Sequence, residues 1–290
     1  MTQWLNILIQ GGLLGGLYAL LATGLSLSFG IMRMINIAHG DLAILAAFLA
    51  FAIAEYFGIN PFGTLLVVVP AMAFLGYVFQ RAVLNRTLGH DILPPLLVTF
   101  GFSIIIQNLL LQIFSANTRS LHVGSLGTDS VTLAGGIAIG VLPLIVMATA
   151  LAVLGALQCL FSFTSLGRAF RAASDDSDTA QLMGINNKHV YGLAMGIAMA
   201  VTAIGGVYLA ISANINPAEG AARLIYAFEA VIIGGLGSLW GTLAGGLILG
   251  VAQSIGLQLN PGWGILAGHF AFLATLMLRP NGLFPTTRDR

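Results

Sequence analysis

Long stretches without a single charged side chain constrain this sequence more than any other feature. Six of them cover residues 1–32, 56–80, 92–118, 130–167, 190–218 and 230–278. A helix needs about 20 apolar residues to cross a bilayer core about 30 Å thick, and every one of these stretches is long enough. The whole chain is 58% hydrophobic and only 7% charged. We therefore expect an integral membrane protein whose helices cross the bilayer several times.

Hydropathy also predicts where the helices lie. The expected spans are residues 6–29, 42–57, 62–79, 93–114, 137–161, 190–212, 226–237, 241–258 and 264–278. Segment 226–237 is too short for a full crossing, which leaves a half-helix, a re-entrant segment or the first arm of a broken helix as alternatives. The expected fold is all-α, a polytopic helical membrane bundle of about eight or nine spans with broken or re-entrant segments. Residues 1–30 begin without a basic side chain, so we interpret the first span as a retained helix rather than a signal peptide.

Basic side chains predict the orientation, because short loops rich in Lys and Arg stay in the cytoplasm. Nine of the eleven Lys and Arg residues can all be placed on the cytoplasmic side: Arg33, Arg81, Arg86, Arg168, Arg171, Lys188, Arg279, Arg288 and Arg290. Arg119 and Arg223 are left outside. This arrangement places the N-terminus outside and the C-terminus in the cytoplasm, and it requires an odd number of crossings, either nine or seven with one re-entrant pair.

Glycines recur at every fourth position, as in Gly11/Gly15, Gly12/Gly16, Gly192/Gly196, Gly237/Gly241/Gly245 and Gly246/Gly250. Small residues at this spacing let helix backbones approach closely in lipid, so we expect tight packing within one bundle.

The sequence lacks the motifs that would indicate several other functions. A net charge of +1 without a basic face argues against nucleic acid as a partner. The five histidines are scattered, which predicts no metal site, and no G-x-S-x-G elbow supports an intramembrane hydrolase. The one lysine is not part of a phosphate-binding loop, so if ATP drives this protein, another chain must bind it.

A polar island interrupts the apolar sequence at residues 164–188. We expect a short amphipathic cytoplasmic helix that Ser165 caps, with apolar residues at i+3 and i+4 and with Arg171 and Asp175 as i,i+4 neighbours. Gly184 fits the left-handed residue that ends a helix, and Ile185 is expected to fold back toward Ala180. The alternative interpretation is a solvated linker.

Most of this island, from Gly167 to Asn186, reads G-R-A-F-R-A-A-S-D-D-S-D-T-A-Q-L-M-G-I-N. This stretch resembles the cytoplasmic coupling loop of permeases in the branched-chain amino acid ABC importers, of the LivH type. Further similar stretches are N-I-A-H-G-D at 36–41, T-F-G-F-S-I-I-I-Q-N at 99–108, I-I-G-G-L-G-S-L-W-G-T-L-A-G-G at 232–246 and L-R-P-N-G-L-F at 278–284. The sequence departs from the family at Gln80, where relatives usually carry Glu, and in its three closely spaced acids, Asp175, Asp176 and Asp178.

The resemblance implies one permease domain over residues 1–290 that takes a small solute, by default a branched-chain amino acid, from an external binding protein. Its partners would be a second, LivM-like permease subunit and two ATPase subunits in a bacterial inner membrane. The chain itself would hold no cofactor, because the ATPases bind the ATP, and it would catalyse no reaction. The residues matching the coupling loop are Gly167, Arg168, Ala169, Arg171, Ala172, Asp176, Ala180, Gly184, Ile185 and Asn186.

Two breaks in the helical pattern at membrane depth, 31–41 and 234–241, indicate candidate pathway residues, because irregular backbone is tolerated there only against protein or water. The candidates are Asn36, His39, Gly40, Asp41, Gly234, Gly235, Gly237 and Ser238. Ordinary turns at the bilayer edge are the alternative. We expect Asp41 to neutralise Arg33 or to cap the second helix rather than to carry a proton.

The remaining charges suggest two further roles. Glu219 and Arg223 are spaced to form an exposed pair, and both this pair and Arg119 are candidates for contact with a binding protein. The alternative function is an ion-coupled secondary transporter, in which Asp41 or Glu229 would bind a coupling proton or sodium ion.

Overall fold

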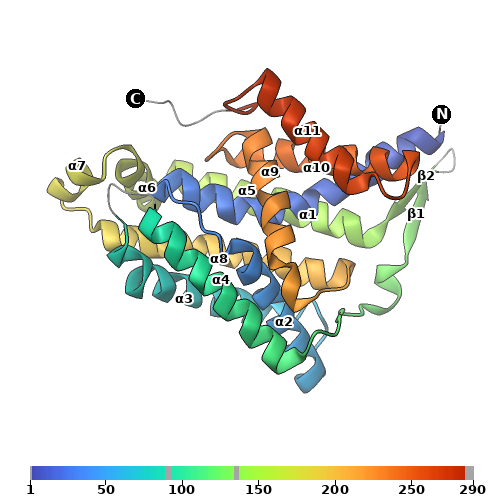
Figure 1. Ribbon diagram of the computed structural model, residues 1–290, viewed down its shortest axis with the longest axis horizontal. Helices are drawn as coiled ribbons and strands as arrows, with labels where there is room; N and C mark the ends of the chain where they lie inside the picture. Colours follow the sequence, from blue (N-terminus) through green and yellow to red (C-terminus); the bar gives the residue numbers. More distant parts are fainter. Residues whose placement is uncertain (1, 89–92, 134–136, 285–290) are drawn as a thin grey trace.

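The computed structural model describes residues 2–88, 93–133 and 137–284, and helices dominate this part of the chain (Figure 1). The α-helices are α1 (Thr2–Met32), α2 (His39–Phe57), α3 (Leu65–Ala82), α4 (Leu93–Phe114), α5 (Val141–Phe163), α6 (Ser165–Asp175), α7 (Ser177–Leu182), α8 (Asn187–Ser212), α9 (Gly220–Gly234), α10 (Leu239–Leu259) and α11 (Gly264–Leu278). Three short 3-10 helices are η1 (Leu84–Arg86), η2 (Gly124–Gly127) and η3 (Pro217–Glu219). Strands β1 (Ser130–Leu133) and β2 (Ile137–Gly140) pair antiparallel, with Val131 opposite Ile139.

Length and hydropathy make seven of the described helices able to cross a membrane: α1, α2, α3 with its extension to Arg86, α4, α5, α8 and α10. The remaining predicted spans became α9 and α11, which have 15 residues each. The chain is therefore an all-α, multi-pass membrane protein, as predicted, and the estimate of eight or nine spans counts these two shorter helices.

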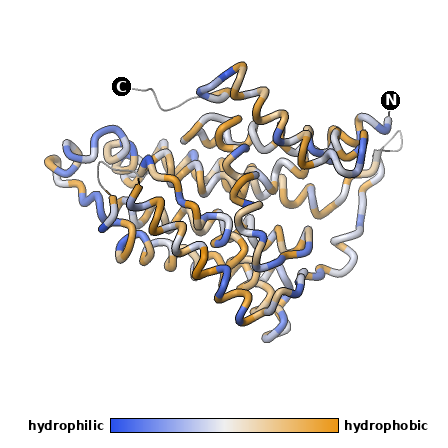
Figure 2. The backbone as a smooth tube through the Cα atoms, in the orientation of Figure 1, coloured by the Kyte–Doolittle hydropathy of each residue, from blue (hydrophilic) through white to orange (hydrophobic). Residues whose placement is uncertain are grey.

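The bundle is built around α8. In the most apolar stretch of α8, 83% of the residues are buried inside the protein, whereas the corresponding shares are 17% in α4 and 22% in α5. Hydrophobic residues occur along the outer helices as well as in the interior, while hydrophilic residues gather at the helix ends and around α6 and α7 (Figure 2). An apolar exterior is what a bilayer requires, so α4 and α5 form part of the lipid-facing perimeter.

Glycines bring α1 and α10 into backbone contact. A Cβ at Gly15 would lie 2.6 Å from the carbonyl oxygen of Gly246, and a Cβ at Gly11 would lie 2.7 Å from the Cα of Val251. Neither position has space for a side chain. The predicted close packing through glycines at every fourth position is confirmed for this helix pair.

The two ends of the bundle differ. The start of α1 lies beside the β1–β2 hairpin, where the Gln10 side-chain amide donates to the carbonyl of Ala138 at 2.8 Å. The short helices α6 and α7 project from the opposite end (Figure 1). In this view α9 crosses the direction of α1, α5 and α8 rather than running along it.

Candidate functional site

The polar island folds as two helices, α6 and α7, and not as the single helix we predicted. Thr164, rather than Ser165, caps α6, because its side-chain oxygen accepts from the backbone N–H of Gly167 at 3.1 Å. Asp176 then has extended backbone and interrupts the helix. The prediction failed at both points because it followed the apolar periodicity across a residue whose side chain competes for backbone N–H groups.

Asp176 caps the second of these helices. Its carboxylate accepts from the backbone N–H groups of Asp178 and Thr179, each at 3.0 Å, and from the Thr179 hydroxyl at 2.6 Å. The hydroxyl and backbone hydrogen bonds from Thr179 hold the pKa of Asp176 below its ordinary value of 3.8. Asp176 is therefore a structural organiser of the island as well as an exposed acid.

Arg171 does not pair with Asp175. Its guanidinium donates instead to the backbone carbonyl of Phe161, near the end of α5. This contact fastens α6 to α5 at the position where the chain leaves the membrane-spanning helix.

The end of α7 is as predicted. Gly184 has a left-handed φ of 87°, and the N–H of Ile185 donates to the carbonyl of Ala180 at 3.0 Å. Asn186 then caps α8 by accepting from the backbone N–H of His189 at 3.2 Å. The island thus has defined starts and stops, which an unstructured linker lacks.

Burial divides the ten predicted coupling residues into three groups. Gly167 and Ala180 are buried, Ala169, Ala172 and Ile185 are half-buried, and the others are exposed: Arg168, Arg171, Asp176, Gly184 and Asn186. The exposed tip also carries two apolar side chains that we did not predict, Leu182 and Met183, which are 88% and 81% exposed. The buried Phe170 anchors α6 by packing against Phe161, with ring centroids 5.6 Å apart.

A pocket of about 890 Å³ connects α6 with the rest of the bundle. Arg171 and Asp175 line it from α6, Gly30 and Arg33 from the end of α1, and residues 237–240 from the second break. A movement of α6 would therefore change the surroundings of both α1 and the segment before α10.

The first predicted break lies between α1 and α2, where Asn36 makes a local contact and His39, Gly40 and Asp41 make long-range ones. Asn36 is fully buried, and its side-chain oxygen accepts from the N–H of Ala38 at 3.1 Å. The His39 ring lies 2.8 Å from the carbonyl of Leu21, near the middle of α1. Gly40 contacts the carbonyl oxygen of Gly220, where α9 begins, so closely that a Cβ would collide with it.

Asp41 has a different partner from the one we expected. Its carboxylate accepts from the Ser103 hydroxyl of α4 at 2.5 Å, and among the described residues it forms no ion pair with Arg33. It lies in the first turn of α2, where a negative charge is favourable, although Ala38 is the cap of that helix.

The second predicted break separates α9 from α10. Gly235 and Gly237 have positive φ values of 105° and 79°, which side chains rarely adopt, and Ser238 caps α10 by accepting from the N–H of Gly241 at 3.1 Å. Gly234 accepts from the N–H of Phe284 at 2.9 Å. Segment 226–237 is therefore the end of a helix and a turn.

The candidate residues of the two breaks lie apart, although Arg33 of the first break lines the same pocket as residues 237–240. Gly40 lies at the start of α9 and residues 234–238 lie at its end. Helix α1 contacts both groups: Gly24 lies near the His39 ring, and a Cβ at Gly30 would be 3.0 Å from the Cα of Gly237. The eight candidates thus form two groups that α9 joins.

The structure also brings together polar residues that the sequence analysis did not connect. The carboxylate of Glu229 of α9 and the ring of His269 of α11 are joined by a hydrogen bond, and the Tyr18 hydroxyl of α1 donates to Gln253 of α10 at 2.5 Å. Glu219 and Arg223 pair at 2.6 Å, as expected, but the pair is half-buried and not exposed. No group of three potential metal-ligating side chains occurs within residues 2–88, 93–133 and 137–284.

Residues 7–278 match the family model of the branched-chain amino acid transport system permease component. The chain belongs to this family. The permease is 30% identical to the high-affinity branched-chain amino acid transport system permease protein LivH of Escherichia coli, over 97% of this chain and 95% of the relative. It is 28% identical to BraD of Pseudomonas aeruginosa, with the same two coverages, and 27% identical to a probable LivH of Methanocaldococcus jannaschii, over 96% of this chain and 92% of that one.

The permease also resembles a solved structure, a chain of PsaBC from Streptococcus pneumoniae in complex with Fab. The TM-score is 0.50 at 14% sequence identity, and the match covers 94% of this permease and 91% of that chain. At this identity the likeness concerns the fold alone.

Proposed function

We propose that this chain is the membrane-spanning subunit of an ATP-binding-cassette importer. It forms one permease domain over residues 1–290 and translocates a small solute, by family default a branched-chain amino acid. An external binding protein delivers the solute, a second related permease completes the route, and two ATPase subunits bind the ATP. The complex resides in a bacterial inner membrane, with α6 and α7 on the cytoplasmic side, and this chain catalyses no chemical step.

The observation that carries the proposal is the structured polar platform of α6 and α7 at one end of an apolar bundle, in a chain of this family. Its exposed side presents charges and the apolar side chains of Leu182 and Met183, while Phe170 and Arg171 fix its inner side to α5. A platform of this kind can receive force from a soluble partner and pass it to the bundle.

The pocket beside α6 suggests how motion would travel. A push on α6 would move Arg171 and Asp175 relative to Gly30 and to residues 237–240, which line the same pocket. Gly237 is the left-handed residue of the break, so this segment is suited to act as a hinge. The candidate pathway residues at the two ends of α9 would then shift together.

An ion-coupled secondary transporter is the second candidate, and it is favoured by two acids within the bundle, Asp41 and Glu229, that are each only 4% exposed. Such a protein would accumulate solute in liposomes without partners. The importer requires ATPase subunits for accumulation against a gradient. Reconstitution of this chain alone therefore separates the two functions.

The test of the coupling assignment replaces exposed residues of the platform in the complete transport complex. We expect Arg168→Ala to lower leucine uptake and ATPase co-purification about tenfold, as loss of a charge-assisted contact predicts. Asp176→Ala should do the same, but it also removes the α7 cap, so Asp176→Asn, which keeps a capping oxygen, separates the loss of charge from the loss of structure. Glu55→Gln, an exposed acid at the end of α2, is the matched control. Normal uptake and co-purification in both alanine variants would overturn the coupling assignment.

A further inference from the structure

One side of α9 is polar although the helix lies among membrane-spanning helices. Arg223, Tyr226 and Glu229 are spaced three residues apart, so they lie along the same side of the helix. They place a cation at one end, an aromatic ring in the middle and a carboxylate at the other end.

Three other helices add polar or aromatic groups to this side. The Tyr18 ring of α1 lies 5.6 Å from the Tyr226 ring between centroids, and Tyr226 stacks with His269 of α11 at 6.4 Å. The Tyr18 hydroxyl also donates to the side chain of Gln253 of α10 at 2.5 Å. We call Tyr18, Arg223, Tyr226, Glu229, Gln253 and His269 the α9 cluster.

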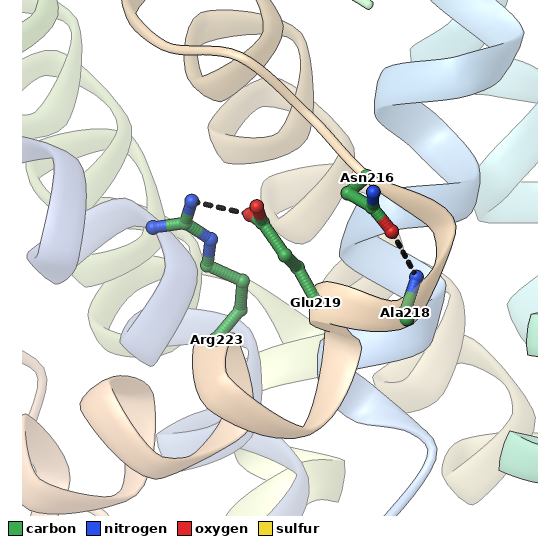
Figure 3. A network of polar contacts seen from close by, with 4 residues as sticks. All are labelled: Asn216, Ala218, Glu219 and Arg223. Atoms are coloured by element: carbon green, nitrogen blue, oxygen red, sulfur yellow. Dashed lines mark hydrogen bonds and ion pairs between the residues drawn. The ribbon is translucent and has the colours of Figure 1, made fainter. Parts of the chain in front are cut away.

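The α9 cluster has hydrogen-bonding capacity that the protein leaves unused. The Nε of Arg223, the Oε2 of Glu229 and the Nε2 of Gln253 are buried without a partner. Arg223 uses one nitrogen for Glu219 (Figure 3), and Glu229 uses one oxygen for His269. Because buried polar groups are normally satisfied, each of these atoms indicates room for a partner such as water or a ligand.

The cluster also opens to the outside of the bundle. The side chain of His269 is 39% exposed and that of Arg223 is 19% exposed. On the same helix Ile225 is 50% exposed, and Ala222 is exposed as well. Tyr18 lies near the middle of α1, so this opening is at membrane depth, where a charged group is stable only against water or another protein.

We propose that the α9 cluster is an intramembrane binding station for the zwitterionic head of an α-amino acid. The guanidinium of Arg223 binds the carboxylate, and the free oxygen of Glu229 binds the ammonium group. Arg223 and Glu229 are about 9 Å apart along the helix axis, a gap that their long side chains and a bound zwitterion can close. The rings of Tyr18 and Tyr226 provide an apolar surface for the amino acid's side chain. This inference rests on the proposed function, in which the complete complex carries an amino acid across the membrane.

Solute protection of a nearby cysteine tests the site directly. Cys159, the one cysteine of the sequence, is first replaced by Ser so that it cannot react. In this Cys159→Ser background, Ala222→Cys is placed beside Arg223, and the complete complex is treated with a membrane-impermeant thiol reagent. We expect saturating leucine to slow labelling about tenfold, the effect of roughly 90% occupancy. 4-Methylpentanoic acid, which lacks the ammonium group, should give no protection, and Glu229→Gln should abolish the protection by leucine. Val131→Cys, 54% exposed on the β1–β2 hairpin, should be labelled equally with and without leucine.

Uptake measurements provide the second readout. Glu229→Gln and Arg223→Gln should each lower leucine uptake by about tenfold or more, because each removes a hydrogen bond to a charged group, while Glu55→Gln should not. If the wild-type complex takes up leucine but both variants also do so normally, or if leucine does not protect Ala222→Cys, the binding station is wrong and the importer function stands. If the wild-type complex does not take up amino acids, the proposed function fails and this inference fails with it.

Discussion

At the scale of single residues, glycines decide how closely the spanning helices approach. Gly15 lies against the backbone of α10, since a Cβ there would be 2.6 Å from both the Gly246 oxygen and the Leu247 Cα. Backbone cannot yield as a flexible side chain can. We therefore expect Gly15→Ala to destabilise the permease by about 1–3 kcal/mol through overpacking, measured as a lower melting temperature in detergent.

The neighbouring glycine provides the control. At Gly12 the nearest atom to an added Cβ is a side-chain carbon of Leu247 at 4.0 Å, an ordinary contact distance. Gly12→Ala should leave the melting temperature unchanged or raise it, because alanine favours a helix by about 0.5–1 kcal/mol. Equal effects at the two positions would show that backbone contact is not what selects glycine at Gly15.

At the scale of elements, α7 depends on one carboxylate. The pKa of Asp176 is below 3.8 in the folded protein, so its stabilising contribution is fully present above pH 3.8 and is lost as the pH falls through the folded pKa. We expect proteolytic cleavage between α6 and α8 to increase over this acidic range, as limited proteolysis with an acid-active protease would show. Asp176→Ala should raise cleavage at all pH values.

The same element offers matched variants. Asp176→Asn keeps a capping oxygen without the titrating group, so its cleavage should not depend on pH in this range. Asp175→Ala, at the exposed end of α6, should behave as the wild type. A wild-type protein whose cleavage does not change with acidity would contradict the role of the Asp176 carboxylate.

At the scale of the whole molecule, the two ends of the bundle should lie on opposite sides of the membrane. Leu182 is 88% exposed at the tip of α7, and Val131 is 54% exposed on the hairpin beside the start of α1. In a Cys159→Ser background, we expect Leu182→Cys to react with an impermeant thiol reagent only in inside-out vesicles, and Val131→Cys only in right-side-out vesicles, as the basic residues predict. The reverse pattern would place α6 and α7 outside and exclude coupling to a cytoplasmic ATPase.

Sequence reasoning located most helices because their signals are local. The predicted span 93–114 has the bounds of α4, and the left-handed Gly184 ends α7 as expected. Runs of apolar residues and glycine conformations depend on neighbours along the chain. The break at Asp176 was missed because a competing local hydrogen bond ended the helix where the periodicity continued.

The candidate site was less predictable, because most of its contacts join distant positions. Glu229 meets His269 forty residues later, and Asp41 meets Ser103 rather than the nearby Arg33. Only the spacing of Arg223, Tyr226 and Glu229 was visible as one helix face, and it was overlooked because Glu229 was considered alone.

By itself the sequence determined that this protein is a bundle of membrane helices with two breaks and one polar island, since hydropathy and backbone preferences act over a few residues. Only the tertiary structure decided which helices touch. Backbone contact between α1 and α10, and the assembly of the α9 cluster from four helices, arise from packing between residues far apart in the chain. Buried polar groups take whichever partner packing places beside them, and no local pattern specifies that choice.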